Sequence, residues 1–421
     1  MRAERLGWLL AALALLAAPW FWSGNAALGL LTQVAIAALA CLSYNLLFGQ
    51  GGMLSFGHAV YTGLGCYAAI HALRAVSAGE LPLPVSLVPL AGGLVGLLVA
   101  LPLGWASTRK SGTPFAMITL GLGELVSAAA LMFPAFFGGE AGVSGNRVAG
   151  PAVLGVTFGP QLEVYYLCAL YALVCAGLMR AFSFTPLGRM LNAVRDNAER
   201  AAFVGYDPHA VRFLAFLAAG FFAGIAGGLA ALHFEIASAE VLGAHRSASW
   251  LLFAFLGGSA YFLGPVIGAL LLVLCTGLLS EWTPAWQLYL GLLFLFMVMR
   301  APQGLAGLLV QAWAQARTRP FGAWLPVLLA QALAAGLALL GAGALIELSY
   351  RLQLESVIGG EFRYLGLALD SSRPSSWLGA ATVLLVGWGL GRWLRGRRRH
   401  VSTHDSSPGD ALRQGRSWRS R

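Results

Sequence analysis

Charged side chains are scarce in this sequence of 421 residues. Asp, Glu, Lys and Arg together make up 10% of the residues, whereas 58% are hydrophobic, and Lys110 is the only lysine. A soluble globular domain carries about a quarter charged residues. The scarcity of charge argues against a soluble enzyme or binding domain, and the excess of apolar residues predicts a chain embedded in lipid.

The net charge of +10 is not spread along the chain. Nine arginines and only two aspartates lie between Arg392 and Arg421, so this segment alone is strongly basic. No basic surface interleaved with aromatic residues accompanies it, which argues against nucleic acid as a partner. The segment is typical of the cytoplasmic side of membrane proteins and favours contact with membrane lipid.

Motifs for metal binding and catalysis are also missing. The cysteines lie in apolar runs, without a CxxC pair or a nearby histidine cluster, and are predicted to be core residues. They are Cys41, Cys66, Cys168, Cys175 and Cys275. The segment Gly104–Ser111 approaches a phosphate-binding GxxxxGK[ST] loop, but Arg109 replaces the second glycine and no strand precedes it. The sequence therefore predicts neither an enzyme nor a bound cofactor or metal, and a membrane enzyme would also require a nucleophile motif such as G-x-S-x-G, which is lacking.

Long apolar runs are what the sequence does contain. A helix needs about 20 mostly apolar residues to cross the hydrocarbon core, and these runs predict an all-α, polytopic membrane protein. We expect about ten core transmembrane helices and a C-terminal two-helix hairpin. The expected core spans are 6–22, 27–48, 53–73, 84–107, 115–137, 163–183, 213–234, 248–263, 264–280 and 286–300, and the hairpin spans are 324–346 and 376–394.

The same runs divide the chain into three parts. We expect a transmembrane domain over residues 1–315, a C-terminal extension with two transmembrane helices over 316–395, and a basic tail over 396–421 whose composition predicts disorder. Residues Met1–Ala27 resemble a secretory signal, but a second apolar span follows at once. An uncleaved first helix is therefore favoured.

Basic residues indicate the orientation. With Arg2 and Arg5 in the cytoplasm, the crossing count puts Arg109 and Lys110, the loop 186–212, the segment 300–319 and the basic tail on that same side. Such an excess of Arg and Lys marks cytoplasmic loops. The pattern predicts a multi-pass protein of the bacterial inner membrane with both termini in the cytoplasm.

The stretch 188–205 is too charged to cross lipid and predicts a short cytoplasmic helix. Arg195 and Glu199, and likewise Asp196 and Arg200, stand four residues apart, where ion pairs form on a helix. Ala198, Ala201, Ala202 and Gly205 share one face with little side chain. That face would dock into a groove of another protein, or the helix would lie on lipid headgroups. The candidate docking residues are Gly188, Arg189, Ala193, Arg195, Asp196, Asn197, Ala198, Glu199, Ala201, Ala202 and Gly205.

Polar residues inside apolar spans are candidates for function, because burying charge in lipid costs at least about 2.5 kcal/mol. The candidates for a translocation path or for helix packing are Asn45, Ser55, His58, Glu124, Gly257 and Gly258. Glu124 would line a polar path, hold a helix contact or reach toward the interface. His58 is expected to be a hydrogen-bonded packing residue, and Asn45 and Gln50 to tie helices together.

Three further features allow simpler interpretations. His71 and His233 lie near span ends, where a wet interface accounts for them. The residues Tyr44, Trp250, Trp282 and Trp286 are expected in the aromatic belts at the membrane surface. The segment Gly257–Pro265 would form either a tight turn between two short spans or a broken helix facing a polar path.

Several segments together resemble a known family. Leu42–Ala59, with the sequence LSYNLLFGQGGMLSFGHA, resembles the early signature of the branched-chain amino acid ABC transporter permeases. The later segments Phe115–Val126, Gly138–Gly145, Gly188–Gly205 and Phe255–Ala269 are similar to further segments of that family, in the same order. The resemblance covers approximately residues 30–310.

The resemblance implies a transmembrane permease subunit of an ATP-binding-cassette importer. Such a subunit forms the path for branched-chain or related amino acids, which a periplasmic substrate-binding protein delivers. It implies a second permease subunit, making a heterodimer, and two cytoplasmic ATPase subunits that hold ATP and magnesium. Residues 188–205 would be the ATPase-coupling helix.

Two other functions remain open. Permeases for urea or short-chain amides share these motifs. An ion-coupled secondary transporter would need clustered intramembrane charges, whereas Glu124 stands nearly alone. The extension beyond Arg300–Gly307 departs from the family pattern.

Overall fold

The computed structural model describes residues 2–148, 157–318, 321–358, 361–364 and 367–404. This described part is almost wholly helical, with two short antiparallel sheets of two strands each, so the predicted all-α class is confirmed. The chain forms two compact units, Met1–Val310 and Gln311–Arg421. Each unit is considered by itself.

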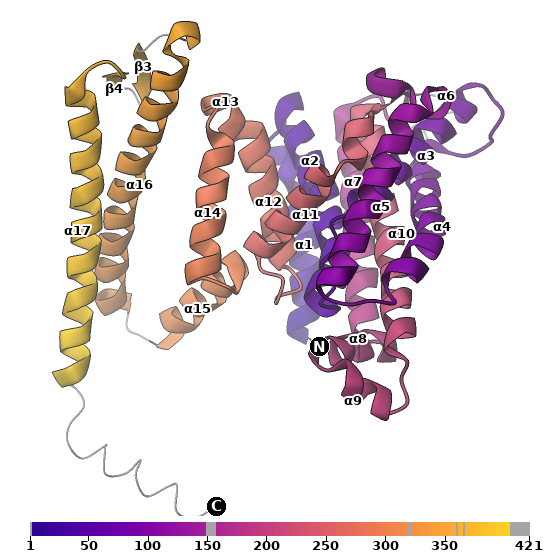
Figure 1. The fold of residues 1–421 in the computed structure, drawn as a ribbon, viewed down its shortest axis with the longest axis horizontal. Coiled ribbons are helices and arrows are strands. Elements are labelled where there is room, and N and C mark those ends of the chain that lie inside the picture. The colour runs from indigo at the N-terminus through magenta and orange to yellow at the C-terminus, as the bar shows by residue number, and fades with distance from the viewer. Residues whose placement is uncertain (1, 149–156, 319–320, 359–360, 365–366, 405–421) are drawn as a thin grey trace, which may run out of the picture. The chain divides into compact units, whose positions relative to one another are not determined.

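The first unit is a bundle of helices of unequal length (Figure 1). In chain order its elements are α1 (Arg2–Phe21), α2 (Asn25–Asn45), the π-helical η1 (Leu46–Gln50), α3 (Ala59–Ser77), η2 (Val85–Leu87), α4 (Val88–Ser107), α5 (Thr113–Met132), α6 (Pro134–Phe137), η3 (Gly139–Ala141), β1 (Val143–Ser144), α7 (Gln161–Phe184), α8 (Pro186–Asp196), α9 (Ala198–Phe203), α10 (Pro208–Phe234), β2 (Ile236–Ala237), η4 (Ala239–Leu242), α11 (Ala244–Gly257), α12 (Gly264–Val273), the π-helical η5 (Leu274–Leu279), α13 (Ser280–Trp282) and α14 (Trp286–Arg300). Helix α15 (Gly304–Thr318) crosses the boundary between the units.

Six described helical stretches are long and apolar enough to cross a membrane. They are Asn25–Gln50, Val85–Ser107, Thr113–Met132, Gln161–Phe184, Pro208–Phe234 and Gly264–Trp282, and each overlaps a span predicted from the sequence. A seventh arises if Trp286–Arg300 and Gly304–Ala314 are counted as one span bent by 54°. The chain is thus a polytopic membrane protein, and the count of about ten core crossings stays a prediction.

Helices α3, α4 and α10 pack closely against one another. A Cβ atom added at Gly224 of α10 would lie 2.3 Å from the carbonyl oxygen of Gly92 in α4, and one added at Gly65 of α3 would lie 2.4 Å from the carbonyl oxygen of Gly224. Only glycine permits this approach. Small residues of this kind hold helices together in lipid, where backbone proximity and dispersion replace the hydrophobic effect.

The bundle has two distinct ends, which lie at opposite ends of α10. At the α8–α9 end, α7 leads into α8, and α10 begins just after α9. At the β1–β2 end, Val143 pairs with Ala237 and Ser144 with Ile236 in an antiparallel register. These two ends provide the frame of reference for the sites.

The segment 51–58 is not helical, so α3 begins six residues later than the predicted span 53–73. Side chains of other helices satisfy its backbone. The amide of Phe56 donates to Oγ1 of Thr119 at 3.2 Å, and the carbonyl oxygen of Ser55 accepts from the hydroxyl of Tyr44 at 3.0 Å. Irregular backbone inside a membrane protein requires such internal partners.

Helices α11 and α12 form a tight hairpin. Helix α11 ends at Gly257, Gly258 has a φ of +114°, and α12 begins at Gly264. A Cβ atom at Gly257 would lie 2.1 Å from the carbonyl oxygen of Gly264, so backbone packs on backbone here. This geometry matches the tight turn, the first of the two structures considered for Gly257–Pro265.

The second unit is a helical hairpin. Its elements are α16 (Phe321–Ile358), β3 (Glu361–Tyr364), β4 (Leu367–Asp370) and α17 (Pro374–His404). The strands pair antiparallel, and the helices approach closely where a Cβ atom at Gly341 would lie 2.3 Å from the amide nitrogen of Leu384. Of the tail predicted to be disordered, residues 396–404 continue α17 and residues 405–421 lie outside the described part.

Candidate functional site

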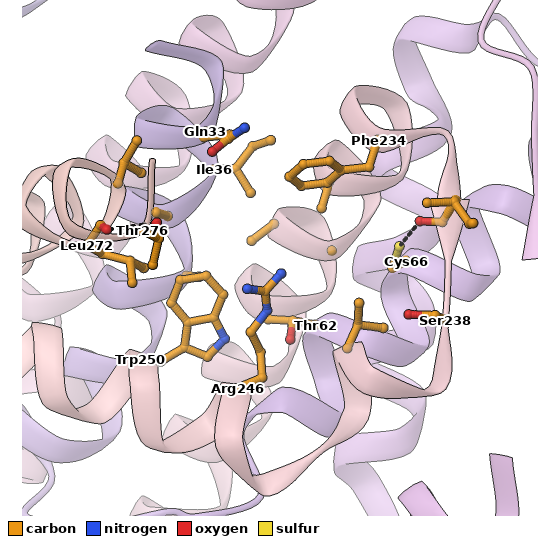
Figure 2. Close-up of a pocket in the computed structure, with 18 residues that line it drawn as sticks. Gln33, Ile36, Thr62, Cys66, Phe234, Ser238, Arg246, Trp250, Leu272 and Thr276 are labelled. Carbon is orange, nitrogen blue, oxygen red and sulfur yellow. Dashed lines mark hydrogen bonds between the residues drawn. The ribbon is translucent and has the colours of Figure 1, made fainter. Parts of the chain in front are cut away.

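Two adjoining cavities lie within the first unit. The first, of about 300 Å³, is enclosed by α2, α3, α10, α11 and the α12–η5 helix, with the β2–η4 segment completing its wall. Figure 2 shows its lining. The second, of about 540 Å³, shares the side chains of Arg246, Trp250 and Thr276 with the first and adds Glu240 and Gln287. Such sizes are ordinary for small-molecule sites.

Arg246 and Trp250 form the polar part of the shared wall. Arg246 lies in the first turn of α11, and Trp250 follows one turn later. In Figure 2 the guanidinium group of Arg246 points into the first cavity beside the indole ring, and its Cζ lies 5.4 Å from the ring centroid. Trp250 is 7% exposed, yet its Nε1 has no hydrogen-bond partner among the described residues. Buried polar groups normally have partners.

A polar network closes the β1–β2 end of the first cavity. Gln33, which lines the cavity, has its Nε2 3.4 Å from Nε2 of His233, and Nδ1 of His233 lies 3.1 Å from Nε2 of Gln161. Arg147 joins this network by donating from Nη2 to Oε1 of Gln161 at 3.5 Å and to the carbonyl oxygen of Gly159 at 3.2 Å. His233 of α10 therefore connects α2 and α7 through hydrogen bonds. A wet interface, as expected from the sequence, does not describe this role.

Three of the predicted polar residues gather around the segment 51–58. His58 is fully buried, with its Nε2 2.9 Å from Oγ of Ser43. Asn45 Oδ1, Ser55 Oγ and His58 Nδ1 are buried without a hydrogen-bond partner among the described residues. None of the three residues lines either cavity. Ser55 and His58 thus lie in the segment that bonds to Tyr44 and Ser43 of α2, and they and Asn45 are apart from the Arg246 site.

The remaining predicted residues are scattered. Glu124 is exposed on α5, and Gly257 and Gly258 lie in the α11–α12 turn. Nε2 of Gln50 donates to Oγ of Ser183 at 2.7 Å, which confirms that Gln50 ties two helices together.

The aromatic belt prediction fails for two residues. Tyr44 is fully buried, and its hydroxyl donates to the carbonyl oxygen of Ser55 at 3.0 Å. Trp250 is buried and lines both cavities, Trp286 is half-buried and lines the second, and Trp282 is exposed. The apolar sequence around Tyr44 and Trp250 is the same on helix faces toward lipid and toward the interior, so composition could not separate them.

The stretch 188–205 forms two helices and not one. The side chain of Thr185 accepts a hydrogen bond from the amide of Gly188 and caps α8; Asn197 accepts from the amide of Arg200 and caps α9. The helix breaks at Asn197, so the ion pairs expected four residues apart are replaced. Arg195 instead pairs with its neighbour Asp196 at 3.0 Å and donates to the carbonyl oxygen of Gly49.

The exposed surface of this stretch also differs from the expected face of small residues. Ala201 is 4% exposed and packs into the core of its own unit, so it is not available for docking. Phe203 and Val204, by contrast, are 90% and 75% exposed. The spacing of small residues gave no indication of these two side chains, although large apolar residues in a charged loop were the available signal.

The other residues of the stretch take different positions. Gly188 is buried and Ala198 half-buried, and Gly205 has a φ of +94° just after α9. The exposed members are Arg189, Ala193, Arg195, Asp196, Asn197, Glu199, Ala202 and Gly205. The result is a polar surface with an apolar tip made by Phe203 and Val204.

Within the described residues, no group of three or more His, Cys, Asp or Glu side chains is arranged to hold a metal ion. All five cysteines are buried and unpaired as disulfides. The polar chemistry of the two cavities comes from the arginine, the indole and the surrounding amides and hydroxyls, with Glu240 and His245 added in the second cavity.

A multi-pass helical bundle with internal cavities and an exposed apolar tip at one end defines a membrane transport protein. A family model described as "Branched-chain amino acid transport system / permease component" matches residues 26–301, and the chain belongs to this family. It is a transmembrane permease subunit of an ATP-binding-cassette importer, and the resemblance of its motifs is confirmed.

Two curated relatives are also described as branched-chain amino acid permeases. The "High-affinity branched-chain amino acid transport system permease protein LivM" of Salmonella typhimurium is 26% identical over 320 residues, covering 70% of this chain and 74% of the relative. The protein of the same name from Escherichia coli is 27% identical with the same coverage. No solved structure matches the chain significantly.

Proposed function

We propose that this chain forms part of the path by which branched-chain or related amino acids enter a bacterial cell. The observation that carries the proposal is that the family match, residues 26–301, falls within the compact unit Met1–Val310 that holds both cavities. Both relatives are named for the high-affinity transport of these amino acids. A periplasmic binding protein delivers the substrate, and ATP hydrolysis on partner subunits supplies the energy.

The α8–α9 end is proposed to face the cytoplasm of a cell whose inner membrane holds the protein. Helix α1, which begins with Arg2, starts at this end (Figure 1). Helix α4 ends here too, because Gly104 approaches the side chain of Phe216 near the start of α10, so Arg109 and Lys110 follow at the same end. Positive charge on one side supports a cytoplasmic location. The basic tail would place the C-terminus there as well.

Two ATPase subunits are proposed as the partners of the α8–α9 end, with ATP and magnesium bound to them. Phe203 and Val204 would enter an apolar groove on one ATPase, because two exposed apolar side chains at a polar tip are suited to such a contact. The caps at Thr185 and Asn197 make the segment stiff enough to transmit movement to α7 and α10. This assignment revises the docking face from the alanines to the tip.

A second permease subunit is proposed to cover α5, giving a heterodimer. Glu124 is exposed on this otherwise apolar helix. An ionised carboxylate facing lipid is costly, so a protein surface or a polar path between subunits suits this face better. Asn45, Ser55 and His58 are assigned to packing around the segment 51–58, because they line neither cavity.

The coupling proposal is tested by Phe203→Asp in the assembled importer. Burying a phenylalanine contributes about 2–3 kcal/mol, so the charge should reduce ATPase stimulation and leucine uptake by at least about tenfold. Membrane insertion should be unchanged. The matched controls are Phe203→Leu, which keeps an apolar tip, and Arg189→Asp, which changes charge on the same segment; both should retain most activity.

Two results would contradict the proposal. Normal ATP-dependent leucine uptake by the Phe203→Asp variant would show that the apolar tip does not couple the permease to the ATPase. Leucine transport by the purified chain alone, driven by an ion gradient, would replace the importer with a secondary transporter.

A further inference from the structure

The wall shared by the two cavities presents hydrogen-bond donors without acceptors. The side chain of Arg246 forms no hydrogen bond or salt bridge with another described residue; its guanidinium group lies against the ring of Trp250 and is attracted at longer range by the carboxylate of Glu240. The indole N–H of Trp250 is buried and also unpartnered among these residues. Because both groups can only donate, what they lack is an acceptor, and an anion satisfies both at once.

The rest of the first cavity is mainly apolar, with a few neutral polar side chains such as Gln33 and Thr276, and carries no carboxylate. Ile36, Phe234, Ile236, Leu272 and Val273 contribute most of its bulk, and the only charged lining residue is Arg246. An anion bound here would therefore need to carry an aliphatic group of modest size. A cavity of about 300 Å³ leaves room for one such molecule.

The second cavity supplies the opposite charge. Glu240 lines it together with Arg246, so a carboxylate and a guanidinium group face the same space. A molecule that spans the shared wall would meet positive charge and apolar surface on one side and negative charge on the other. An α-amino acid in its zwitterionic form has this pattern of groups.

We propose that Arg246 and Trp250 bind the α-carboxylate of an aliphatic amino acid, with its side chain in the first cavity and its ammonium group directed toward Glu240. This inference rests on the proposed import of amino acids and identifies the binding site within this subunit. Arg246 binds through a planar fork suited to carboxylates. Trp250 adds one donor and a flat apolar surface.

The same site disfavours the alternative substrates. Urea and short amides are neutral and have little apolar surface, so they would leave the guanidinium group without a carboxylate acceptor and the apolar wall unfilled. A site that hydrogen-bonds a substrate group strongly rejects molecules lacking that group. The carboxylate is therefore the group by which the permease itself selects.

The test measures equilibrium binding of radiolabelled leucine to the assembled importer in nanodiscs, without nucleotide or binding protein. Leucinol, which replaces the carboxylate by a hydroxymethyl group, is the competitor. The wild-type complex should bind leucine at least about tenfold more tightly than leucinol, because hydrogen bonds to charged groups dominate the difference. Nanodiscs with and without anionic lipid should give the same result, which distinguishes a substrate from a lipid headgroup.

Arg246→Met should weaken leucine binding at least about tenfold while leaving leucinol binding within about threefold, so that selectivity is lost. Trp250→Phe keeps the ring, removes the N–H and should weaken leucine binding by about threefold to tenfold. The chain offers a matched control: Arg109 stands 3.6 Å over Trp105 with the same spacing in sequence, but both are exposed and line neither cavity. Arg109→Met and Trp105→Phe should leave both affinities unchanged.

Equal affinity for leucine and leucinol in the wild type, or an equal loss of both in Arg246→Met, would overturn the site. So would the absence of leucine binding at millimolar concentration. ATP-dependent leucine uptake is measured separately with the binding protein present. If uptake persists while the two variants bind leucine normally, the import function stands and this site is wrong. If leucine binds selectively but is not taken up, the site stands and the import function is wrong.

Discussion

Both units of the chain contain a close helix–helix contact at a glycine, but the contact supports different structures in the two units. In Met1–Val310, Gly224 lets α10 approach α4 so closely that an added Cβ atom would lie 2.3 Å from the carbonyl oxygen of Gly92. Helix α10 also forms a wall of the first cavity. In Gln311–Arg421, Gly341 lets α16 approach α17 equally closely, because an added Cβ atom would lie 2.3 Å from the amide nitrogen of Leu384. This hairpin has a small core around Leu348. A close glycine contact therefore says that helices touch, and the surrounding elements decide what depends on that contact.

The largest expected difference between the units comes from substituting the two matched glycines. Gly224→Val places a side chain against the backbone of α4, so we expect loss of folded permease and of leucine uptake. Gly341→Val creates an equal clash against α17 but should disturb the hairpin alone. Uptake and the yield of monodisperse protein in detergent measure both effects.

The control for this pair is Gly336→Val, since an added Cβ there meets nothing within 4 Å. It should leave both the hairpin and transport intact. Equal loss of transport from Gly224→Val and Gly341→Val would show that the two units depend on each other.

A smaller effect is expected from the buried polar group near segment 51–58. His58→Leu removes the contact with Ser43 and leaves the hydroxyl without this partner, so the free energy of unfolding of the first unit should fall by about 1–3 kcal/mol. Denaturant unfolding in detergent measures the change, and leucine affinity should be retained. His71→Leu is the control, because His71 is only half-buried and bonds to the carbonyl oxygen of Phe136. A selective loss of leucine binding in His58→Leu would instead assign His58 to the translocation path.

The smallest effect on transport is expected from removing the second unit. A stop after Thr318 keeps α15 whole and deletes α16 and α17. Because the first unit is compact by itself and contains the family match, uptake should stay within about twofold of the full chain. Complete loss of uptake at normal expression would make the hairpin an integral part of the permease.

The candidate site was only partly predictable. Apolar length predicted the long helices, because the bilayer imposes that length directly. The break at Asn197 was missed, since the i, i+4 pattern of charges looked continuous and the side chain of Asn197 ended one helix and began another. The exposure of Phe203 was missed because the helical spacing of small residues defines a helix face. That spacing does not tell which face the rest of the bundle covers.

By itself the sequence determined that the chain is an all-α membrane protein, that six of its apolar stretches are long enough to cross, and to which permease family it belongs. These follow from local composition and short motifs. Only the tertiary structure decided that Arg246 and Trp250 share a cavity with Ile36, Thr62 and Phe234, from four different helices. Trp105, near the end of α4, and Arg109, in the turn that follows, have the same spacing in sequence and lie outside the cavities. Sequence spacing fixes local neighbours but not what the other helices bring against them.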